Sequence, residues 1–159
     1  MFSEELPTVA DLDELTRFYR SDGGDDLYVR WSRGPGVDLA PELAAQASRD
    51  GLTGVELPGL SANSLRCEPW WRGRSTRLWL ARRLYDYQHL RALRGPGVRP
   101  WLLRGREVAR GPDNEPLVAC DEPLAWVADE VLREARELVD AQGSPEWGPM
   151  DRRTAHLPE

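Results

Sequence analysis

The charges of this chain are distributed unevenly, and any fold must accommodate that distribution. The segment 66–110 holds 12 arginines and 3 acids, whereas each flank, 1–65 and 111–159, holds 12 acids. In chain order the formal charges are −7, +9 and −8, which give the net charge of −6. Charges attract one another effectively only over short distances in salt. We therefore expect the arginines to contact either the acidic flanks or an anionic ligand.

All 21 basic residues are arginine, and the chain contains neither lysine nor isoleucine. Lysine and isoleucine codons are A/T-rich, so a GC-rich genome explains much of this bias. Every cation is nevertheless a guanidinium, which binds carboxylate or phosphate through two N–H groups and stacks on tryptophan. Four of the seven tryptophans lie in the same basic segment, namely Trp70, Trp71, Trp79 and Trp101.

The length of 159 residues predicts one domain. We expect it to cover residues 1–142, followed by a flexible tail at 143–159 that has three prolines and few apolar residues. No apolar run reaches the length of a membrane span, and the first residues lack the pattern of a signal peptide. Two cysteines do not predict a disulfide framework. We therefore expect a cytoplasmic protein that does not enter a membrane.

Turn residues divide the chain into short segments with alternating helix and strand patterns. The expected helices are one capped by Thr8, one at 41–49, one at 76–93, and one at 123–141 capped by Asp121. The expected strands are 27–31, a bent strand or two short ones at 55–65, 101–103, 107–109 and 116–120. This order predicts an α+β fold with a mostly antiparallel sheet and three or four helices.

The helix expected at 76–93 has an arginine-rich side opposite its apolar side. Trp79, Arg82 and Arg83 share that side, where arginines and an aromatic ring could contact a nucleic acid. The acidic character of the whole chain argues against this, because it repels nucleic acid. Asp86 lies at helical spacing from both arginines. We therefore favour intramolecular pairing of the arginines with acids.

Motifs for metal or nucleotide binding are absent from the sequence. The two histidines and two cysteines lack the spacing of a metal site. The acids in 113–122 lack a calcium-loop pattern, and no Walker or Rossmann glycine pattern occurs. Cys67 and His89 could form a nucleophile–base pair, although a helix histidine with a structural hydrogen bond is the commoner case. We predict no metal site.

One ordered set of residues resembles the arginine–serine–glutamate class of ADP-ribosyltransferases. Arg30 lies in an early strand, Ser61 and Ser64 lie in the next, and Glu115 directly precedes a late strand. The resemblance implies that Arg30 binds the phosphates of NAD and that Ser61 or Ser64 supports the nicotinamide pocket. It also implies that Glu115 stabilises the positive charge that develops on the sugar, as carboxylates do in glycoside hydrolysis.

The sequence departs from that class at two points. Its serine motif is Ser-Ala-Asn-Ser, where the class has Ser-Thr-Ser. Asp113 replaces the first acid of the Glu-x-Glu pair, which leaves the acceptor open. Purely structural roles are the alternative, with Arg30 paired to an acid, the serines in turns, and Glu115 a loop acid.

A second resemblance covers most of the chain. Five segments are similar to a family of small uncharacterised actinobacterial proteins: 27–35, 57–60, 68–71, 79–83 and 110–118. This resemblance implies an actinobacterial source and a single cytoplasmic domain. It implies no function.

Three functional hypotheses follow. The first is an anionic small-molecule site lined by Arg30, Glu115 and tryptophans such as Trp31, with NAD as a candidate cofactor. The second is a non-catalytic module that binds a protein partner through exposed arginine and tryptophan, which are enriched at binding hot spots; its candidates are Trp70, Trp71 and Trp79. The third is nucleic-acid binding. The first predicts a cleft shared by Arg30 and Glu115, and the second predicts an exposed aromatic patch.

Overall fold

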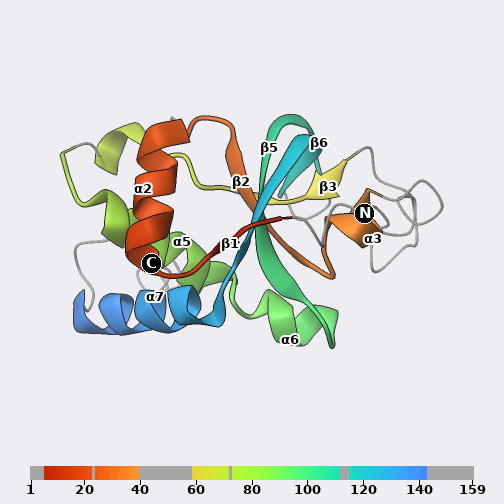
Figure 1. Ribbon diagram of the computed structural model, residues 1–159. Helices are drawn as coiled ribbons and strands as arrows, with labels where there is room; N and C mark the ends of the chain where they lie inside the picture. The colour runs from red at the N-terminus through yellow and green to blue at the C-terminus, as the bar shows by residue number, and fades with distance from the viewer. Residues whose placement is uncertain (1–5, 23, 40–58, 72, 112–114, 143–159) are drawn as a thin grey trace, which may run out of the picture.

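A curled sheet organises the chain, and helices cover one of its faces (Figure 1). The computed structural model describes residues 6–22, 24–39, 59–71, 73–111 and 115–142. Within them the elements are β1 (Thr8–Val9), α2 (Leu12–Asp22), β2 (Leu27–Ser32), α3 (Pro35–Asp38), β3 (Leu60–Ser61), β4 (Asn63–Ser64), the 3-10 helix η1 (Pro69–Trp71), α5 (Thr76–Tyr87), α6 (Leu90–Arg94), β5 (Arg99–Arg110), β6 (Pro116–Val127) and α7 (Asp129–Gln142).

The strand order in the described sheet is β1-β6-β5-β2-β4, and β3 also pairs with β6. β1 runs parallel to β6, whereas the other pairs are antiparallel. The predicted α+β class with a mostly antiparallel sheet is therefore confirmed. Helices α2, α5 and α7 lie together on one side of the sheet, on the left in Figure 1, while α3 and β3 lie on the other.

The β5–β6 hairpin is the longest paired region and carries the bend of the sheet. Its register shifts at Leu102/Leu103, at Arg104/Gly105 and at Glu107/Ala109. Such irregularities increase the local twist of a strand pair. Gly105 allows one of them, because a Cβ atom there would lie 2.5 Å from the carbonyl oxygen of Ala119.

Residues 60–64 connect the bent hairpin back to β2. β3 pairs with β6 at Leu117 and Val118, whereas β4 pairs with β2 through Asn63 and Ser64. Between them the Ala62 amide donates to the Pro116 carbonyl at 3.3 Å. One short segment therefore contacts both the tip of the hairpin and the edge of β2.

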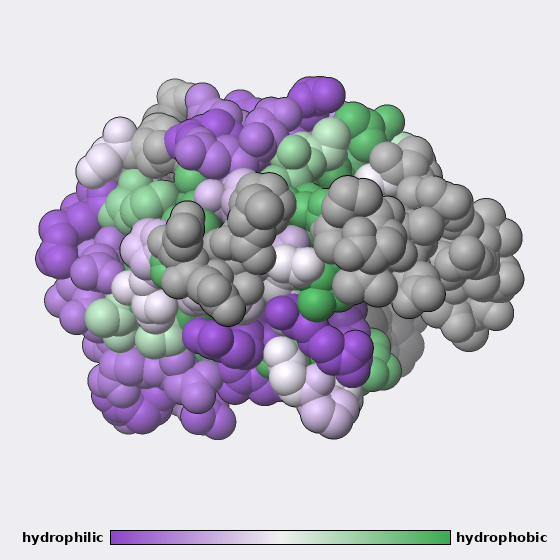
Figure 2. Space-filling view, turned by 45° about the vertical axis from the view of Figure 1, so that its right-hand side comes forward, coloured by the Kyte–Doolittle hydropathy of each residue, from purple (hydrophilic) through white to green (hydrophobic). Residues whose placement is uncertain are grey.

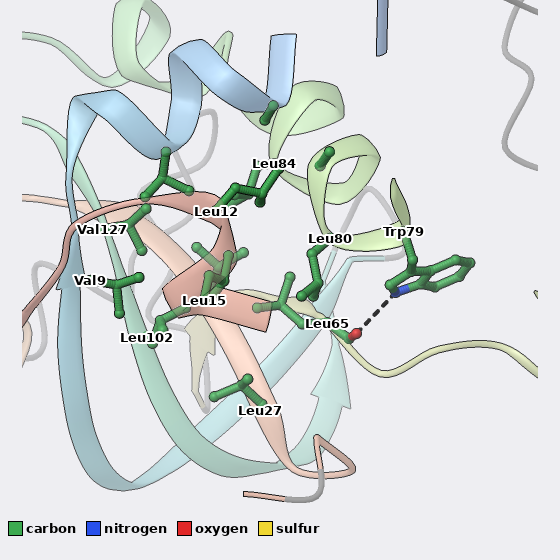
Figure 3. Packing of buried hydrophobic residues seen from close by; sticks show 14 of the residues in the cluster. Val9, Leu12, Leu15, Leu27, Leu65, Trp79, Leu80, Leu84, Leu102 and Val127 are labelled. Carbon is green, nitrogen blue, oxygen red and sulfur yellow. Dashed lines mark hydrogen bonds between the residues drawn. The ribbon is translucent and has the colours of Figure 1, made fainter. Parts of the chain in front are cut away.

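The curl gives the sheet two separate hydrophobic cores. The larger lies under the helices and includes Leu12, Leu80 and Leu102 (Figure 3). The smaller lies on the other face and is built from Ala62, Trp101, Leu103, Val118 and Trp126. Neighbours along β5 alternate between the cores, because successive strand side chains point to opposite faces.

Five arginines of the basic segment pair with acids of the flanks in the described chain. The pairs are Arg77–Asp13, Arg91–Asp129, Arg104–Glu122, Arg106–Asp121 and, at 3.9 Å, Arg66–Asp25. Exposed pairs of this kind each contribute at most about 1 kcal/mol. Intramolecular pairing is thus confirmed for these arginines. The visible described surface in Figure 2 is largely hydrophilic, and its hydrophobic areas are small and separated.

The predicted start of the helix at 123–141 is wrong. Residues 116–127 form one strand, β6, and α7 begins only at Asp129. Ala125 and Val127 enter the larger core while Trp126 enters the smaller, so the period is two. Pairing with β5 as far as Trp126 overrides the helix-start signal of Asp121 and the following proline.

Three other boundaries also differ from the prediction. The helix predicted at 76–93 is interrupted after Tyr87, and α6 begins at Leu90. The two strand pieces at 101–103 and 107–109 belong to one strand, β5. Thr8 lies in β1, and the carboxylate of Asp11 accepts the Glu14 amide at the helix start. The predicted helix at 41–49 and the tail at 143–159 lie outside the described residues.

Substituting Gly105 with alanine tests the close approach in the hairpin. We expect Gly105→Ala to lower the free energy of unfolding by about 1–3 kcal/mol, because the added methyl group collides with backbone. Gly73→Ala is the comparison, since it has φ +81° but no atom within 4 Å, and should cost only about 1 kcal/mol. Urea denaturation measures both. Equal losses would contradict a steric role for Gly105.

Candidate functional site

A buried ion pair lies on the face of β2 that points away from the helices. Arg30 is 6% exposed and Asp38 3%, and the Arg30 Nε lies 2.5 Å from the Asp38 Oδ2. Arg30 also donates from Nη1 to the Ser61 carbonyl at 2.7 Å. A buried arginine needs such partners, because an uncompensated charge away from water is costly. The pair therefore connects β2, α3 and β3.

Hydrogen bonds extend this pair into a network. The Ser32 hydroxyl donates to the Asp38 carboxylate at 2.5 Å, and the Trp101 indole Nε1 donates to the Ser32 Oγ at 2.8 Å. Gly34, which precedes α3, has φ +113° and donates its amide to the same Ser32 oxygen. A satisfied buried network of this kind holds its members in one geometry.

Arg94 lies close to the same network. Its Nη1 donates to the Trp31 carbonyl at 2.8 Å, on the edge of β2. Burial and then the neighbouring Arg30 charge lower the pKa of Arg94 to about 10, and the carboxylates of Asp38 and Glu115 act in the opposite direction. The electrostatic surroundings of Arg94 therefore include both Arg30 and Glu115.

A pocket in the described chain has a volume of about 850 Å³. We call it the Ser64–Glu115 pocket. It is lined by residues from β2, the β4 region, α5, β5 and the start of β6: Asp25, Tyr28, Asn63, Ser64, Arg66, Glu68, Pro69, Arg83, Tyr87, Glu107, Arg110, Glu115 and Pro116. Residues 60–64 pair with β6 through β3 and with β2 through β4. Segments that are distant in the chain therefore meet around this pocket.

Arg83 is held firmly on one wall of the Ser64–Glu115 pocket. Its Nε donates to the Ser64 carbonyl at 3.1 Å, and its guanidinium carbon lies 5.3 Å from the Tyr87 ring centroid. Arg110, which also lines the pocket, pairs with Glu107 at 3.0 Å. Burial and then the Glu107 charge raise the pKa of Tyr28, so its hydroxyl stays protonated at neutral pH.

The structure separates the predicted site residues into two groups. Arg30 contacts Ser61 through the Ser61 carbonyl. Ser64 and Glu115 line the Ser64–Glu115 pocket, whereas Arg30 and Ser61 are not among its lining residues. Asp113 lies outside the described residues.

The tryptophans named as candidates mainly support the fold. Trp70, Trp71 and Trp79 contact one another with ring centroids 5.4–5.7 Å apart. Trp71 and Trp79 are each 1% exposed, and the Trp79 Nε1 donates to the Leu65 carbonyl (Figure 3). Trp70 is 37% exposed. Trp31 is buried, and its Nε1 has no hydrogen-bond partner within the described chain.

Burial of Trp79 corrects the predicted arginine-rich side of the helix. Arg82 on the same side is also buried, at 8% exposed, and pairs with Asp86 at 2.8 Å. The sequence spacing did indicate that pair. Arg83 alone of the three reaches the Ser64–Glu115 pocket.

Sequence reasoning missed Asp38, Asn63 and Arg94 as members of these sites. Asp38 follows the Gly-Pro-Gly turn by two residues, and nothing in the local pattern indicates that α3 turns it toward Arg30. Asn63 lies in the Ser-Ala-Asn-Ser segment, which departs from the Ser-Thr-Ser motif of the ADP-ribosyltransferase class. That departure was the one feature of the sequence that could have indicated Asn63.

Together these observations describe a small α+β protein with a buried polar network and an arginine-lined pocket. The chain matches the "Family of unknown function (DUF6098)" over residues 2–148, and it belongs to that family. No curated protein and no solved structure matches the chain.

Neither a membrane-spanning helix nor a cluster of metal ligands is found among the described residues. None of the described helices combines the length and the apolar character that a membrane span requires. In the same part of the chain, no three histidine, cysteine or acidic side chains are grouped as metal ligands.

The Arg30–Asp38 pair should dominate the stability of the smaller core. We expect Asp38→Ala to lower the free energy of unfolding by about 3–5 kcal/mol, because it removes a buried carboxylate that pairs with the buried Arg30 charge. Asp121→Ala removes the exposed partner of Arg106 and should cost less than about 1 kcal/mol. Urea denaturation compares the two. Small and similar losses of unfolding free energy for both variants would contradict the prediction. They would show that water hydrates the Arg30 guanidinium once Asp38 is removed.

Both cysteines should be poor nucleophiles in the folded protein. Burial raises the pKa of Cys120 to about 11 and also raises the pKa of Cys67. An unfolded thiol titrates near about 8.5, so the folded protein holds far less thiolate at pH 8. We expect slow alkylation by iodoacetamide at pH 8 that accelerates up to about pH 11, and fast alkylation in urea. Equal rates in the folded and unfolded protein would contradict this.

Proposed function

We propose that this protein binds an anionic small molecule in the Ser64–Glu115 pocket. The observation that carries the proposal is that Ser64, Arg83 and Glu115, from three distant parts of the chain, line one pocket of about 850 Å³. Pockets of roughly 300–1,000 Å³ accommodate drug-sized ligands. Guanidinium groups bind carboxylate and phosphate with two hydrogen bonds, and Arg83 is held in place for such a contact.

In its finer form the proposal names NAD as the ligand and ADP-ribose transfer as the reaction. Glu115 then stabilises the positive charge that develops on the sugar. Arg30 is engaged by Asp38 and Arg66 lies 3.9 Å from Asp25, so the phosphate contact in this form belongs to Arg83. The proposal also includes an actinobacterial source and a cytoplasmic location, supported by the absence of lysine and isoleucine and by two free cysteines.

The other two hypotheses have less support. A protein-binding aromatic patch needs exposed rings, and Trp71 and Trp79 are buried. A nucleic-acid surface needs arginines that face solvent without acidic partners, and at least five arginines of the basic segment have such partners. An anion in the Ser64–Glu115 pocket needs no exposed ring, and it needs one arginine without an acidic partner among the described residues, which Arg83 supplies.

Arg83→Gln tests the proposal directly. We expect wild type to bind NAD or AMP in isothermal titration calorimetry, and Arg83→Gln to bind at least about tenfold more weakly, because a charge-assisted hydrogen bond is lost. Arg106→Gln is the matched control, since Arg106 is exposed on β5 and does not line the pocket. No binding of either ligand to wild type, or equal weakening by both substitutions, would contradict the proposal.

A further inference from the structure

The Asn63 side chain lies at the edge of the Ser64–Glu115 pocket, and its amide group makes no hydrogen bond to the described residues. It is 9% exposed, it lies in β4, and it lines the Ser64–Glu115 pocket. Its backbone pairs with Val29, but no hydrogen bond to its amide group joins it to the described residues. Among the described residues only Trp31 Nε1 is a buried side-chain polar atom without a partner, so the Asn63 amide is open to the pocket. Its N–H groups can donate to the acceptor oxygens of a ligand there.

Arg83 supplies a second set of donors at the same corner of the pocket. Its Nε donates to the carbonyl of Ser64, the residue after Asn63. Its two terminal nitrogens donate no hydrogen bond to the described residues, although the rings of Tyr87 and Trp79 lie 5.3 and 5.9 Å from its guanidinium carbon. A fixed guanidinium with free terminal N–H groups matches the geometry of an oxyanion.

Ser64 adds a third polar group to this corner. Its Oγ accepts the Arg66 amide at 3.1 Å, which leaves the hydroxyl hydrogen available to donate. The Arg66 side chain also lines the pocket. Asn63, Ser64 and Arg83 therefore each offer N–H or O–H donors to the pocket, and Arg83 adds a positive charge. A phosphate group, with several acceptor oxygens, uses more of these donors than a carboxylate can.

Acids line another part of the same pocket, and we call Glu107 and Glu115 its acidic wall; Asp25 and Glu68 also line the pocket. Glu107 and Glu115 come from β5 and from the residue before β6. Ionised carboxylates accept hydrogen bonds only, so this wall suits ligand hydroxyl groups. Arg110 offsets part of the negative charge by pairing with Glu107. A ligand that fits both the donors and this acidic wall carries an anion and hydroxyl groups.

We infer that the Ser64–Glu115 pocket recognises a ribosyl phosphate ester, with the phosphate at Asn63 and Arg83 and the vicinal sugar hydroxyls at Glu107 and Glu115. This inference rests on the proposed function and narrows it. It assigns Asn63 as a binding residue and separates the roles of the two walls. It requires a phosphate group esterified to a ribosyl sugar, a feature that NAD shares with AMP, and it does not require the rest of NAD.

Calorimetry with three ligands separates the phosphate contact from the contact with the sugar hydroxyls. AMP carries both groups, adenosine lacks the phosphate, and 2′,3′-dideoxy-AMP lacks the hydroxyls. Wild type should bind AMP at least about tenfold more tightly than either of the others, since each loses charge-assisted hydrogen bonds. Inorganic phosphate and ribose 5-phosphate show whether the base is needed.

Substitutions then assign each contact to a wall. Asn63→Asp keeps the size of the side chain but repels phosphate, and Arg83→Gln removes the charge. Both should reduce the preference for AMP over adenosine to within about twofold and leave the preference over dideoxy-AMP intact. Glu115→Gln should reduce the preference for AMP over dideoxy-AMP and leave the preference for AMP over adenosine intact. Arg106→Gln and Glu122→Gln, at exposed positions outside the pocket, should change neither preference.

The outcomes separate the inference from the proposed function. If no anionic ligand binds wild type, the proposed function fails and the inference fails with it. If anions bind and Arg83→Gln weakens them, but AMP and dideoxy-AMP bind equally, only the inference is overturned. Equal weakening of AMP and adenosine by Arg83→Gln also overturns it. Circular dichroism of each variant shows that it is folded, and Arg83→Gln decides the phosphate contact if Asn63→Asp does not fold.

Discussion

The irregular pairing of β5 with β6 is the constraint on which the rest of the structure depends. Three register shifts bend a hairpin whose strands are 12 residues long. Because the hairpin bends, residues 60–64 can pair with β6 through β3 and with β2 through β4. That double pairing encloses the smaller core and brings the Ser61 carbonyl to Arg30. A flat hairpin would hold the tip of β6 away from β2 and leave neither the ion pair nor the pocket intact.

Arginine side chains complete the backbone hydrogen bonding at the open edges of this curled sheet. Arg30, Arg83 and Arg94 donate to the carbonyls of Ser61, Ser64 and Trp31. Unpaired strand-edge carbonyls are sites where another chain can add, and charged groups on the edge discourage this. The guanidinium reaches such carbonyls while keeping further donors for other groups. Much of the arginine content therefore has a structural use that requires no ligand.

The sequence indicated the class of fold and the strand around Arg30, because four of the residues 27–31 are apolar, β-branched or aromatic and turns bound the segment. It failed at 121–127, where an acid and a proline looked like a helix start although the segment pairs with β5. In that segment, pairing with β5, which the curl of the sheet brings alongside, overrode the local helix propensity. The charge layout correctly indicated that arginines and acidic flanks meet.

The candidate sites were less predictable for the same reason. Arg30 and Ser61 were named from their order in the chain and do meet, yet the meeting uses the Ser61 backbone and not its hydroxyl. Asp38 could not be named, because its approach to Arg30 depends on the turn at Gly34, where φ is +113°. A Cβ atom at Gly34 would lie 2.4 Å from the Trp126 ring. Tertiary packing, which leaves no local pattern, fixes that turn.

The network around Arg30 and Asp38 differs from the Ser64–Glu115 pocket in how far the fold satisfies its polar groups. This difference indicates where a ligand is expected to bind. Around Arg30 and Asp38, each charge is buried and satisfied by the fold, so the network is suited to holding β2, β3 and α3 together. In the Ser64–Glu115 pocket, Asn63 and the outer nitrogens of Arg83 are held in place by the same sheet edge but are not satisfied by the described chain. Folded sequences depart from local consistency mainly at functional sites. Unsatisfied donors beside a satisfied network therefore mark the pocket, and not the ion pair, as the place where a ligand completes the structure.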